Sequence, residues 1–244
     1  MYTRPAAFVA AATLLAGCAG SANRTVADQT LPFAGASSPG VAVSGAARQS
    51  SRRGAVPAVR GPHIFIANVL LNEVLAYNSR GRSIRPRIKG LSRPLGVAID
   101  GNGKIYVVNN QDGTLRTFTS AGAPTTPVIT GLDDPQCVAV DANGKIYITN
   151  LANGTLTTYA SDGSPTTPTI TGLANPIGVA VDSSEKIYVE NQGSDAISTF
   201  TADGAPTTPT ITEGINSPDG LAVDANGKKL RCELREQHGD DIQP

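Results

Sequence analysis

The stretch Gly90–Thr130 reads GLSRPLGVAIDGNGKIYVVNNQDGTLRTFTSAGAPTTPVIT, a unit of 41 residues. Close copies of it follow as Gly131–Thr171 and Gly172–Thr212, at the same spacing of 41 residues. A fixed period of this size is the sequence signature of solenoids, propellers and other repeat arrays. The repeat therefore predicts the architecture of this chain before any single residue points to a function.

Within one repeat, turn residues separate short segments that are rich in β-branched and aromatic side chains. Glycine and asparagine between the segments favour tight turns, and proline in the last segment suits an outer edge strand. Four antiparallel strands per period of about 40 residues are typical of a propeller blade, whereas the rungs of a β-solenoid are shorter, at roughly 18–25 residues. The sequence predicts an all-β propeller of four-stranded antiparallel blades. The strands expected in the first repeat are Leu95–Asp100, Lys104–Asn109, Thr114–Thr119 and Pro127–Thr130.

The aromatic residues support this register. Eight of the eleven aromatics occupy two repeated positions, one in the second strand and one in the third. An aromatic that recurs in each unit indicates packing between neighbouring units, because a functional side chain is not needed in every blade. The second-strand residues are Phe65, Tyr106, Tyr147 and Tyr188, and the third-strand residues are Tyr77, Phe118, Tyr159 and Phe200.

Partial repeats flank the three complete ones, so that the propeller is expected to span residues 61–244 and to hold about four blade equivalents. His63–Lys89 aligns with strands two to four and lacks a first strand, while Ile215–Asn226 supplies a first strand and little more. The two together could complete one split blade. Residues 229–244 do not resemble the repeat, and we interpret this tail as the product of a frameshift that truncates a longer propeller. A native four-bladed ring is the alternative.

The amino terminus has the features of an export signal. Ala6–Leu15 is a run of small and apolar residues that is too short to cross a bilayer, for which roughly 20 residues are needed. The following Leu15-Ala16-Gly17-Cys18 resembles the lipobox of bacterial lipoproteins, which implies a signal peptide over residues 1–18 and lipid attachment at Cys18. An ordinary cleaved signal is the alternative. The residue after Cys18 is Ala19, not the aspartate associated with inner-membrane retention, so the resemblance implies an outer-membrane lipoprotein.

Residues 19–60 are rich in alanine, serine, glycine and arginine, and they predict a disordered, flexible tether between membrane and domain. Between Arg48 and Arg93, ten arginines and lysines stand against one acid, Glu73. This basic segment either keeps the tether solvated, which we favour, or lies on anionic lipid head groups. The net charge of the whole chain is zero, and no nucleic-acid-binding motif is present, so a nucleic-acid partner is not expected.

The pattern PxGVAVDxxGxIYVxN occurs with small variations at Pro94–Asn109, Pro135–Asn150 and Pro176–Asn191. It resembles the repeats of NHL-type propellers and of the related virginiamycin B lyase and gluconolactonase-like propellers. The resemblance implies a propeller fold, and NHL propellers usually have six blades. A lyase of this kind would need a catalytic histidine with a divalent metal, and a lactonase would need Glu, Asn and Asp converging on the central channel.

The sequence does not assign those roles to particular residues. The only histidines, His63 and His238, lie at the start of the domain and in the tail, and neither falls in a complete repeat. Glu190 breaks the repeat where other units have Ala, Val or Thr, and we interpret it as a solvated strand residue. Cys137 replaces a repeated glycine and is interpreted as a small packed residue; no disulfide framework is expected. Repeated aspartates and asparagines favour turn capping over metal binding: Asp100, Asp141, Asp182 and Asp224, and Asn68, Asn109, Asn150 and Asn191.

We therefore expect no catalytic, cofactor-binding or metal-binding residues, and no cofactor. The predicted function is that of a non-catalytic, lipid-anchored scaffold in the bacterial cell envelope. Its partners would be the membrane, through the lipid on Cys18, and a protein or glycan ligand. Two alternatives remain open: a fragment of a propeller lyase or lactonase-type hydrolase, and an inactive frameshifted product.

Overall fold

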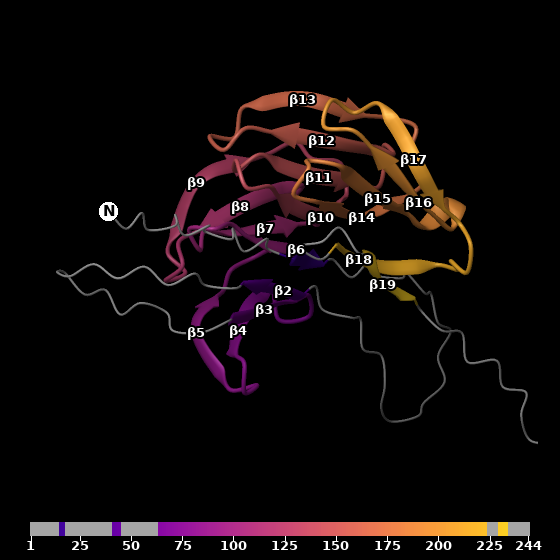
Figure 1. Cartoon of the computed structure of the whole chain (residues 1–244). Helices are drawn as coiled ribbons and strands as arrows, with labels where there is room; N and C mark the ends of the chain where they lie inside the picture. Colours follow the sequence, from indigo (N-terminus) through magenta and orange to yellow (C-terminus); the bar gives the residue numbers. More distant parts are fainter. Residues whose placement is uncertain (1–14, 18–40, 45–62, 224–228, 234–244) are drawn as a thin grey trace, which may run out of the picture.

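The computed structural model describes residues 15–17, 41–44, 63–223 and 229–233. Apart from one short 3-10 turn, every helix or strand in these ranges is a β-strand. The strands form five antiparallel sheets, and within each sheet they lie side by side in sequence order. The prediction of an all-β propeller with antiparallel four-stranded blades is confirmed (Figure 1).

Each repeat of the sequence forms one sheet. The first sheet comprises β1 (Leu15–Gly17), β2 (Val41–Ser44), β3 (His63–Asn68), β4 (Glu73–Asn78) and β5 (Ser83–Ile88). The second comprises β6 (Pro94–Ile99), β7 (Ile105–Asn109), β8 (Thr114–Phe118) and β9 (Pro124–Ile129). The third comprises β10 (Pro135–Val140), β11 (Ile146–Asn150), β12 (Thr155–Tyr159) and β13 (Pro165–Ile170). The fourth comprises β14 (Pro176–Val181), β15 (Ile187–Asn191), β16 (Ala196–Phe200) and β17 (Pro206–Ile211), with the 3-10 turn η1 (Gln192–Ser194) after β15. The fifth pairs β18 (Pro218–Val223) with β19 (Lys229–Glu233).

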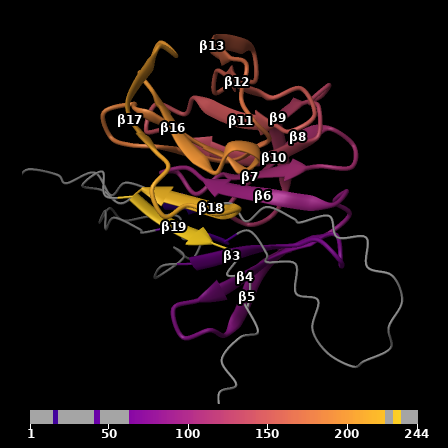
Figure 2. The ribbon, with the colours of Figure 1, turned by 90° about the vertical axis from the view of Figure 1, so that its right-hand side faces the viewer.

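The sheets follow one another as the blades of a propeller. The inner strands β6, β10, β14 and β18 each lie beside the next, and β2 and β3 lie beside β6. The blades form an arc that runs from β5 at one end to β17 and the β18–β19 pair at the other (Figures 1 and 2). Strand β1 contacts β6, β14 and β18, so its backbone lies against the inner strands of several blades.

The hydrophobic core lies between the blades, as the repeated aromatics predicted. Tyr106 of the second blade packs in one buried cluster with Val138 and Ile146 of the third blade. Phe65 of the first blade packs with Val97 of the second in another. Because side chains alternate between the two faces of a strand, each blade contributes one apolar face to each of its neighbours. A single blade would leave both faces exposed to water.

The first blade contains an inner strand that the repeat comparison missed. Val41–Ser44 forms β2 and pairs with β3, with Val41 opposite Ile66 and Val43 opposite Ile64. This is the register that the second blade uses between β6 and β7. The signal was present in the sequence, because Gly40–Val43 reads GVAV, as Gly178–Val181 does. A long insertion before β3 hides the match from a comparison at a fixed spacing.

The first residues of the tail form a strand, which their lack of likeness to the repeat did not predict. Lys229–Glu233 forms β19 and pairs with β18 in the register of β14 and β15. The ladder is made by backbone groups, so a strand can form where the side chains do not follow the repeat. The expected pairing between the Ile215–Asn226 segment and the first blade is not observed, since β3 already pairs with β2. Residues 234–244 lie outside the described residues, as do most of residues 1–18 and 19–60.

Candidate functional site

The aspartate that follows each inner strand holds the next turn in place. Asp100 Oδ1 accepts hydrogen bonds from the backbone N–H groups of Asn102 and Lys104, both at 2.9 Å. Its Oδ2 accepts a bond from the Tyr106 hydroxyl at 3.2 Å. Burial, followed by the neighbouring carboxylate, raises the pKa of that hydroxyl, so the phenol stays neutral and donates. Asp141 and Asp182 make equivalent bonds, as the turn-capping interpretation predicted; Asp224 lies outside the described residues.

The repeated asparagines at the ends of the second strands also hold the framework together. Asn109 Oδ1 accepts a bond from the backbone N–H of Ser92, and its Nδ2 donates to Thr114 Oγ1. Asn150 and Asn191 are equally buried and make similar contacts. These amides join the start of a blade to its second and third strands. They are therefore engaged in holding the strands of each blade together.

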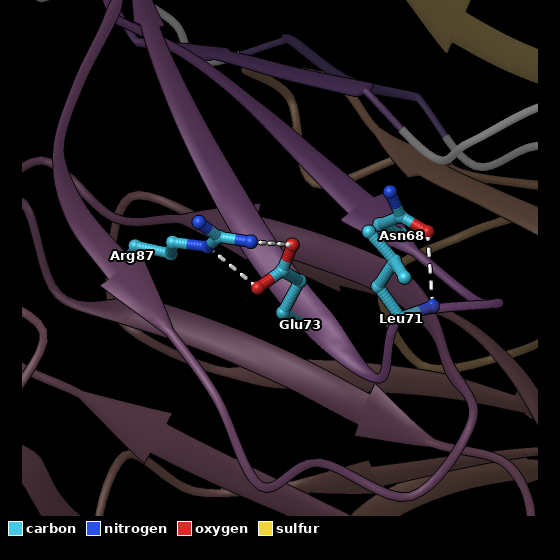
Figure 3. A network of polar contacts seen from close by, with 4 residues as sticks. All are labelled: Asn68, Leu71, Glu73 and Arg87. Carbon is cyan, nitrogen blue, oxygen red and sulfur yellow. Dashed lines mark hydrogen bonds and ion pairs between the residues drawn. The ribbon is translucent and has the colours of Figure 1, made fainter.

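Glu73 and Arg87 form an ion pair in the first blade, at the positions that Thr114 and Val128 occupy in the second blade. Arg87 donates from Nε and Nη2 to the two carboxylate oxygens of Glu73, at 2.6 and 2.7 Å (Figure 3). The hydrogen bonds and the positive charge of Arg87 hold the pKa of Glu73 below its usual range. In the same view, Asn68 Oδ1 accepts a bond from the backbone N–H of Leu71. The single acid of the basic segment is thus occupied in cross-strand pairing between β4 and β5.

Glu190 is the polar residue that departs most clearly from the repeat, and it is fully buried. It lies in β15 opposite Gly178, and a Cβ atom built on that glycine would overlap the Glu190 carboxylate. The missing side chain of Gly178 therefore leaves room for the carboxylate inside the blade. Both carboxylate oxygens accept the backbone N–H of Gly220 in β18, at 2.9 and 3.1 Å. Glu190 thus bridges the fourth blade to the fifth, and our interpretation of it as a solvated residue was wrong.

A second buried carboxyl group, Asp219, stands next to that amide. It is 5% exposed and occupies the repeat position of Leu95, Gln136 and Ile177. Burial raises the pKa of Glu190 to about 7; the Gly220 amide opposes this shift, and the charge of Asp219 adds to it. Sequence reasoning missed Asp219, although its departure from the apolar or neutral residues at that position was a usable signal. Together, Glu190 and Asp219 form an acidic pair at the boundary between β15 and β18.

The remaining candidates are separated from this pair. His63 lies buried at the start of β3, in a complete blade and not in an incomplete one as predicted, and burial lowers its pKa. Cys137 is fully buried and disulfide-bonded, so the expectation of no disulfide is wrong for this residue. The chain has two other cysteines, Cys18 and Cys232, and neither side chain is among those described. His238 also lies outside the described residues.

Two kinds of feature are absent from the described part of the chain. Within it, no group of three or more His, Cys, Asp or Glu side chains has the geometry to hold a metal ion. The same ranges contain no helix long and apolar enough to cross a membrane. The acidic pair, the buried histidine and the repeated caps are therefore the polar features that any functional proposal must explain.

The arrangement of the sheets is that of a β-propeller. Solved propeller structures match this chain over most of its length. A streptogramin B lyase matches with a TM-score of 0.57 and 12% sequence identity, covering 74% of this chain and 67% of the lyase. Virginiamycin B lyase from Staphylococcus aureus matches with a TM-score of 0.54 and 13% identity, covering 72% of this chain and 67% of that one.

A gluconolactonase from Xanthomonas campestris is similar to the same extent. Its TM-score is 0.57 at 14% identity, with 70% of this chain and 65% of the gluconolactonase covered. These matches establish the fold that the repeat resemblance implied. No family model and no curated protein sequence matches the chain. At such low identity the comparisons concern the architecture alone.

Proposed function

We propose that this protein is a non-catalytic binding scaffold, a β-propeller that presents its loops to a protein or glycan ligand in the bacterial cell envelope. The observation that supports the proposal is that the repeated polar residues form hydrogen bonds within the fold. In each complete repeat, the aspartate caps a turn and the asparagine joins strands. Side chains that already make hydrogen bonds within the framework in every repeat serve the fold, and this supports a role without a substrate or a metal ion.

One exposed turn favours a protein ligand. Leu70 and Leu71, between β3 and β4, are 79% and 61% exposed, whereas the second blade has Gln111 and Asp112 at these positions. Neighbouring exposed leucines at the tip of a rigid turn are costly in water, and such surfaces commonly mark contact sites. The surrounding blade holds this turn on a fixed support, which suits a scaffold.

The second element of the proposal is a lipid anchor on Cys18, with an outer-membrane destination. It is supported by the apolar run and the Leu15-Ala16-Gly17-Cys18 sequence. Cleavage before Cys18 would remove β1 (Leu15–Gly17), so the first blade of the anchored protein would consist of β2 to β5. One sulfur atom cannot carry both a thioether-linked lipid and a disulfide. The anchor therefore requires that the disulfide partner of Cys137 is Cys232.

Replacement of Cys18 tests the anchor directly. We expect Cys18→Ser to abolish incorporation of a labelled fatty acid and to release the protein from the membrane fraction, because two or more acyl chains are what makes such attachment stable. Cys232→Ser is the control and should retain the label. Peptide mapping of the wild-type protein should show Cys137 joined to Cys232. A disulfide between Cys18 and Cys137 in the mature protein would rule the anchor out.

A propeller lyase or lactonase-type hydrolase is the second candidate. The fold likeness favours it, together with the acidic pair formed by Glu190 and Asp219, because neighbouring carboxyl groups are usual components of acid–base or metal chemistry. Against it, Glu190 is completely buried and already accepts the Gly220 amide.

Calorimetric titration with divalent cations separates the two candidates. We expect no stoichiometric heat when Ca²⁺, Mn²⁺ or Zn²⁺ is added to the full chain, since the Glu190 oxygens are engaged and inaccessible. Glu190→Gln should give the same flat titration. Tight binding of one ion per chain that disappears in Glu190→Gln would overturn the scaffold proposal and favour a metal-dependent enzyme.

A further inference from the structure

The outer strand of the first blade differs in charge from the outer strands of the other blades. Strand β9 reads PTTPVI, and β13 and β17 both read PTTPTI, whereas β5 reads SIRPRI and is followed by a lysine. Basic side chains therefore stand at three positions where the other outer strands have threonine or valine: Arg85, Arg87 and Lys89.

These basic side chains lie on the solvent-facing side of the strand. Successive side chains of a strand point to opposite faces, so Arg85 and Arg87 are exposed, whereas Pro86 and Ile88 are buried. Strands β9 and β13 show the same alternation, although each belongs to a blade that has a blade on either side. The exposure of these positions is therefore a property of the outer strand and does not depend on what lies before the first blade.

Further basic side chains extend this face at both ends of β5. Arg80 and Arg82 are exposed in the turn that leads into the strand. Arg116 of the second blade donates from Nη1 to the backbone carbonyl of Gly90, at 3.0 Å, so its guanidinium lies next to the residue that follows Lys89. Six side chains make up this basic patch: Arg80, Arg82, Arg85, Arg87, Lys89 and Arg116.

Little negative charge opposes the basic patch. Glu73 is the one acid between His63 and Ile99 in the sequence, and it pairs with Arg87. Within the described part of the chain, Arg87 is the one member of the patch that forms an ion pair. Six basic groups against one acid leave a net charge of +5 on this surface.

The turn that covers β5 also lacks the acid found in equivalent turns. This turn, between β8 and β9, lies so close that a Cβ atom built on Gly122 would stand 2.5 Å from the Cβ of Pro86. The corresponding glycine turns of the third and fourth blades cover β9 and β13. Those turns carry Asp162 and Asp203 before the glycine, whereas the turn on β5 carries Ala121. Of these three turns, the one without an aspartate is the one that lies on the basic strand.

The chemistry of the basic patch fits a linear anionic polymer. Alternate residues of a strand are about 7 Å apart, so the charges on β5 follow one line. Five of the six side chains are arginines, whose planar guanidinium forms paired hydrogen bonds with carboxylate and phosphate groups. Arg87 already binds the carboxylate of Glu73 in this way.

The surroundings of the patch favour a glycan over other anionic partners. Pro86 and the charges on this edge discourage the addition of a peptide strand. Nucleic acids commonly stack their bases on aromatic side chains, and every aromatic side chain in the described ranges is buried or half-buried. A bilayer binds most firmly where apolar side chains accompany the charge, whereas Pro86 and Ile88 point into the blade.

We propose that the basic patch binds an anionic polysaccharide, a glycan that carries negative charge on successive sugar units. This inference rests on the proposed scaffold function and names the class of glycan that the scaffold holds. It also adds the outer strand of the first blade to the loops as a contact surface.

A fluorescently labelled oligomer of galacturonic acid is a suitable probe, and an uncharged maltose oligomer is its matched control. We expect the full-length protein to bind the galacturonate oligomer with a dissociation constant on the order of 100 µM at low salt, and not to bind the maltose oligomer. Binding should be lost in about 1 M salt, where the screening length is about 3 Å. Fluorescence anisotropy measures each of these.

Variants that copy the other blades locate the contact. Arg85→Thr combined with Lys89→Thr introduces the residues that the second blade has at these positions, so β5 should fold as β9 does. We expect this double variant to bind at least about tenfold more weakly. Lys145→Gln combined with Lys186→Gln removes the same charge from the third and fourth blades and should bind as the wild-type protein does.

Ala121→Asp tests the covering turn. It introduces the acid that the third and fourth blades carry in equivalent turns, so the fold should accept it. Binding should weaken at least about threefold, because the new carboxylate repels an anionic ligand beside the patch.

Absence of binding to the galacturonate oligomer, or equal losses in the two double variants, would overturn the inference. Tighter binding of single-stranded DNA, or of vesicles of phosphatidylglycerol and phosphatidylcholine in equal parts, would also overturn it if the Arg85→Thr and Lys89→Thr double variant weakened that binding. The occupant would then be a nucleic acid or a membrane. The scaffold proposal fails separately, since stoichiometric metal binding overturns it whatever the glycan does.

Discussion

Gly163→Ala is expected to lower the free energy of unfolding by about 2–5 kcal/mol, combining left-handed backbone strain with overpacking between blades. Gly163 has a φ of +89°, a conformation that L side chains adopt at a cost. Its new methyl group would also overlap Pro127 of the preceding blade. The two blades would have to separate, and this would expose the cluster around Ile129.

Gly81→Ala is the matched control, because it occupies the same turn of the first blade. Its φ is +71°, but a Cβ atom there would meet nothing within 4 Å. Only the backbone strain applies, so the expected cost is about 1–2 kcal/mol. Urea unfolding of the full chain, followed by circular dichroism, gives both values. Equal losses for the two variants would show that the contact between glycine and proline does not hold the blades together.

The contribution of Glu190 to the stability of the protein is expected to fall as the pH rises from about 4.5 to about 7, because this group must ionise inside the fold. Its pKa is raised from 4.5 to about 7, chiefly by burial. Between these values the folded chain binds more protons than the unfolded chain, so the free energy of unfolding decreases with pH. The stabilising contribution is complete below pH 4.5 and is lost above about pH 7; its size is about 3 kcal/mol.

Glu190→Gln should remove this pH dependence. Glutamine keeps an oxygen that can accept the Gly220 amide but cannot ionise, so at pH 8 the variant should unfold at a higher urea concentration than the wild-type protein. At pH 4.5 the two should be similar. Glu213→Gln, at an exposed position, should follow the wild-type curve. An unchanged pH profile in Glu190→Gln would show that another group is responsible.

The repeated caps were predictable from the sequence, whereas the acidic pair of Glu190 and Asp219 was not. The roles of Asp100 and Asn109 followed from their recurrence, because a residue needed in every blade serves the blade. Glu190 was recognised as an exception but was placed in solvent, since the sequence does not show that Gly178 leaves space beside it. Asp219 was missed although Asp224, five residues later, was aligned with the repeated aspartates, because no pattern in the sequence shows that the Asp219 position is buried beside Glu190.

Boundaries were harder to predict than the repeating units. The GVAV sequence at Gly40–Val43 is part of the first blade, but its distance from His63 does not match the repeat spacing. Strand β19 pairs with β18 through backbone groups, so the pattern of side chains in the sequence does not predict it. The disulfide of Cys137 joins residues far apart in sequence, and three cysteines do not by themselves fix a pair.

By itself, the sequence determined the period, the four strands of each blade and the packing of aromatics between blades. These properties depend on local alternation and on short turns, and they are repeated often enough to be read without long-range information. Only the tertiary structure decided that the carboxylate of Glu190 accepts the Gly220 amide of the fifth blade and that no turn among the described residues covers Pro209. Burial depends on neighbouring residues, and the identical PTTPTI strands β13 and β17 differ because a four-stranded blade lies beside β13, whereas the described residues place only β18 and β19 after β17.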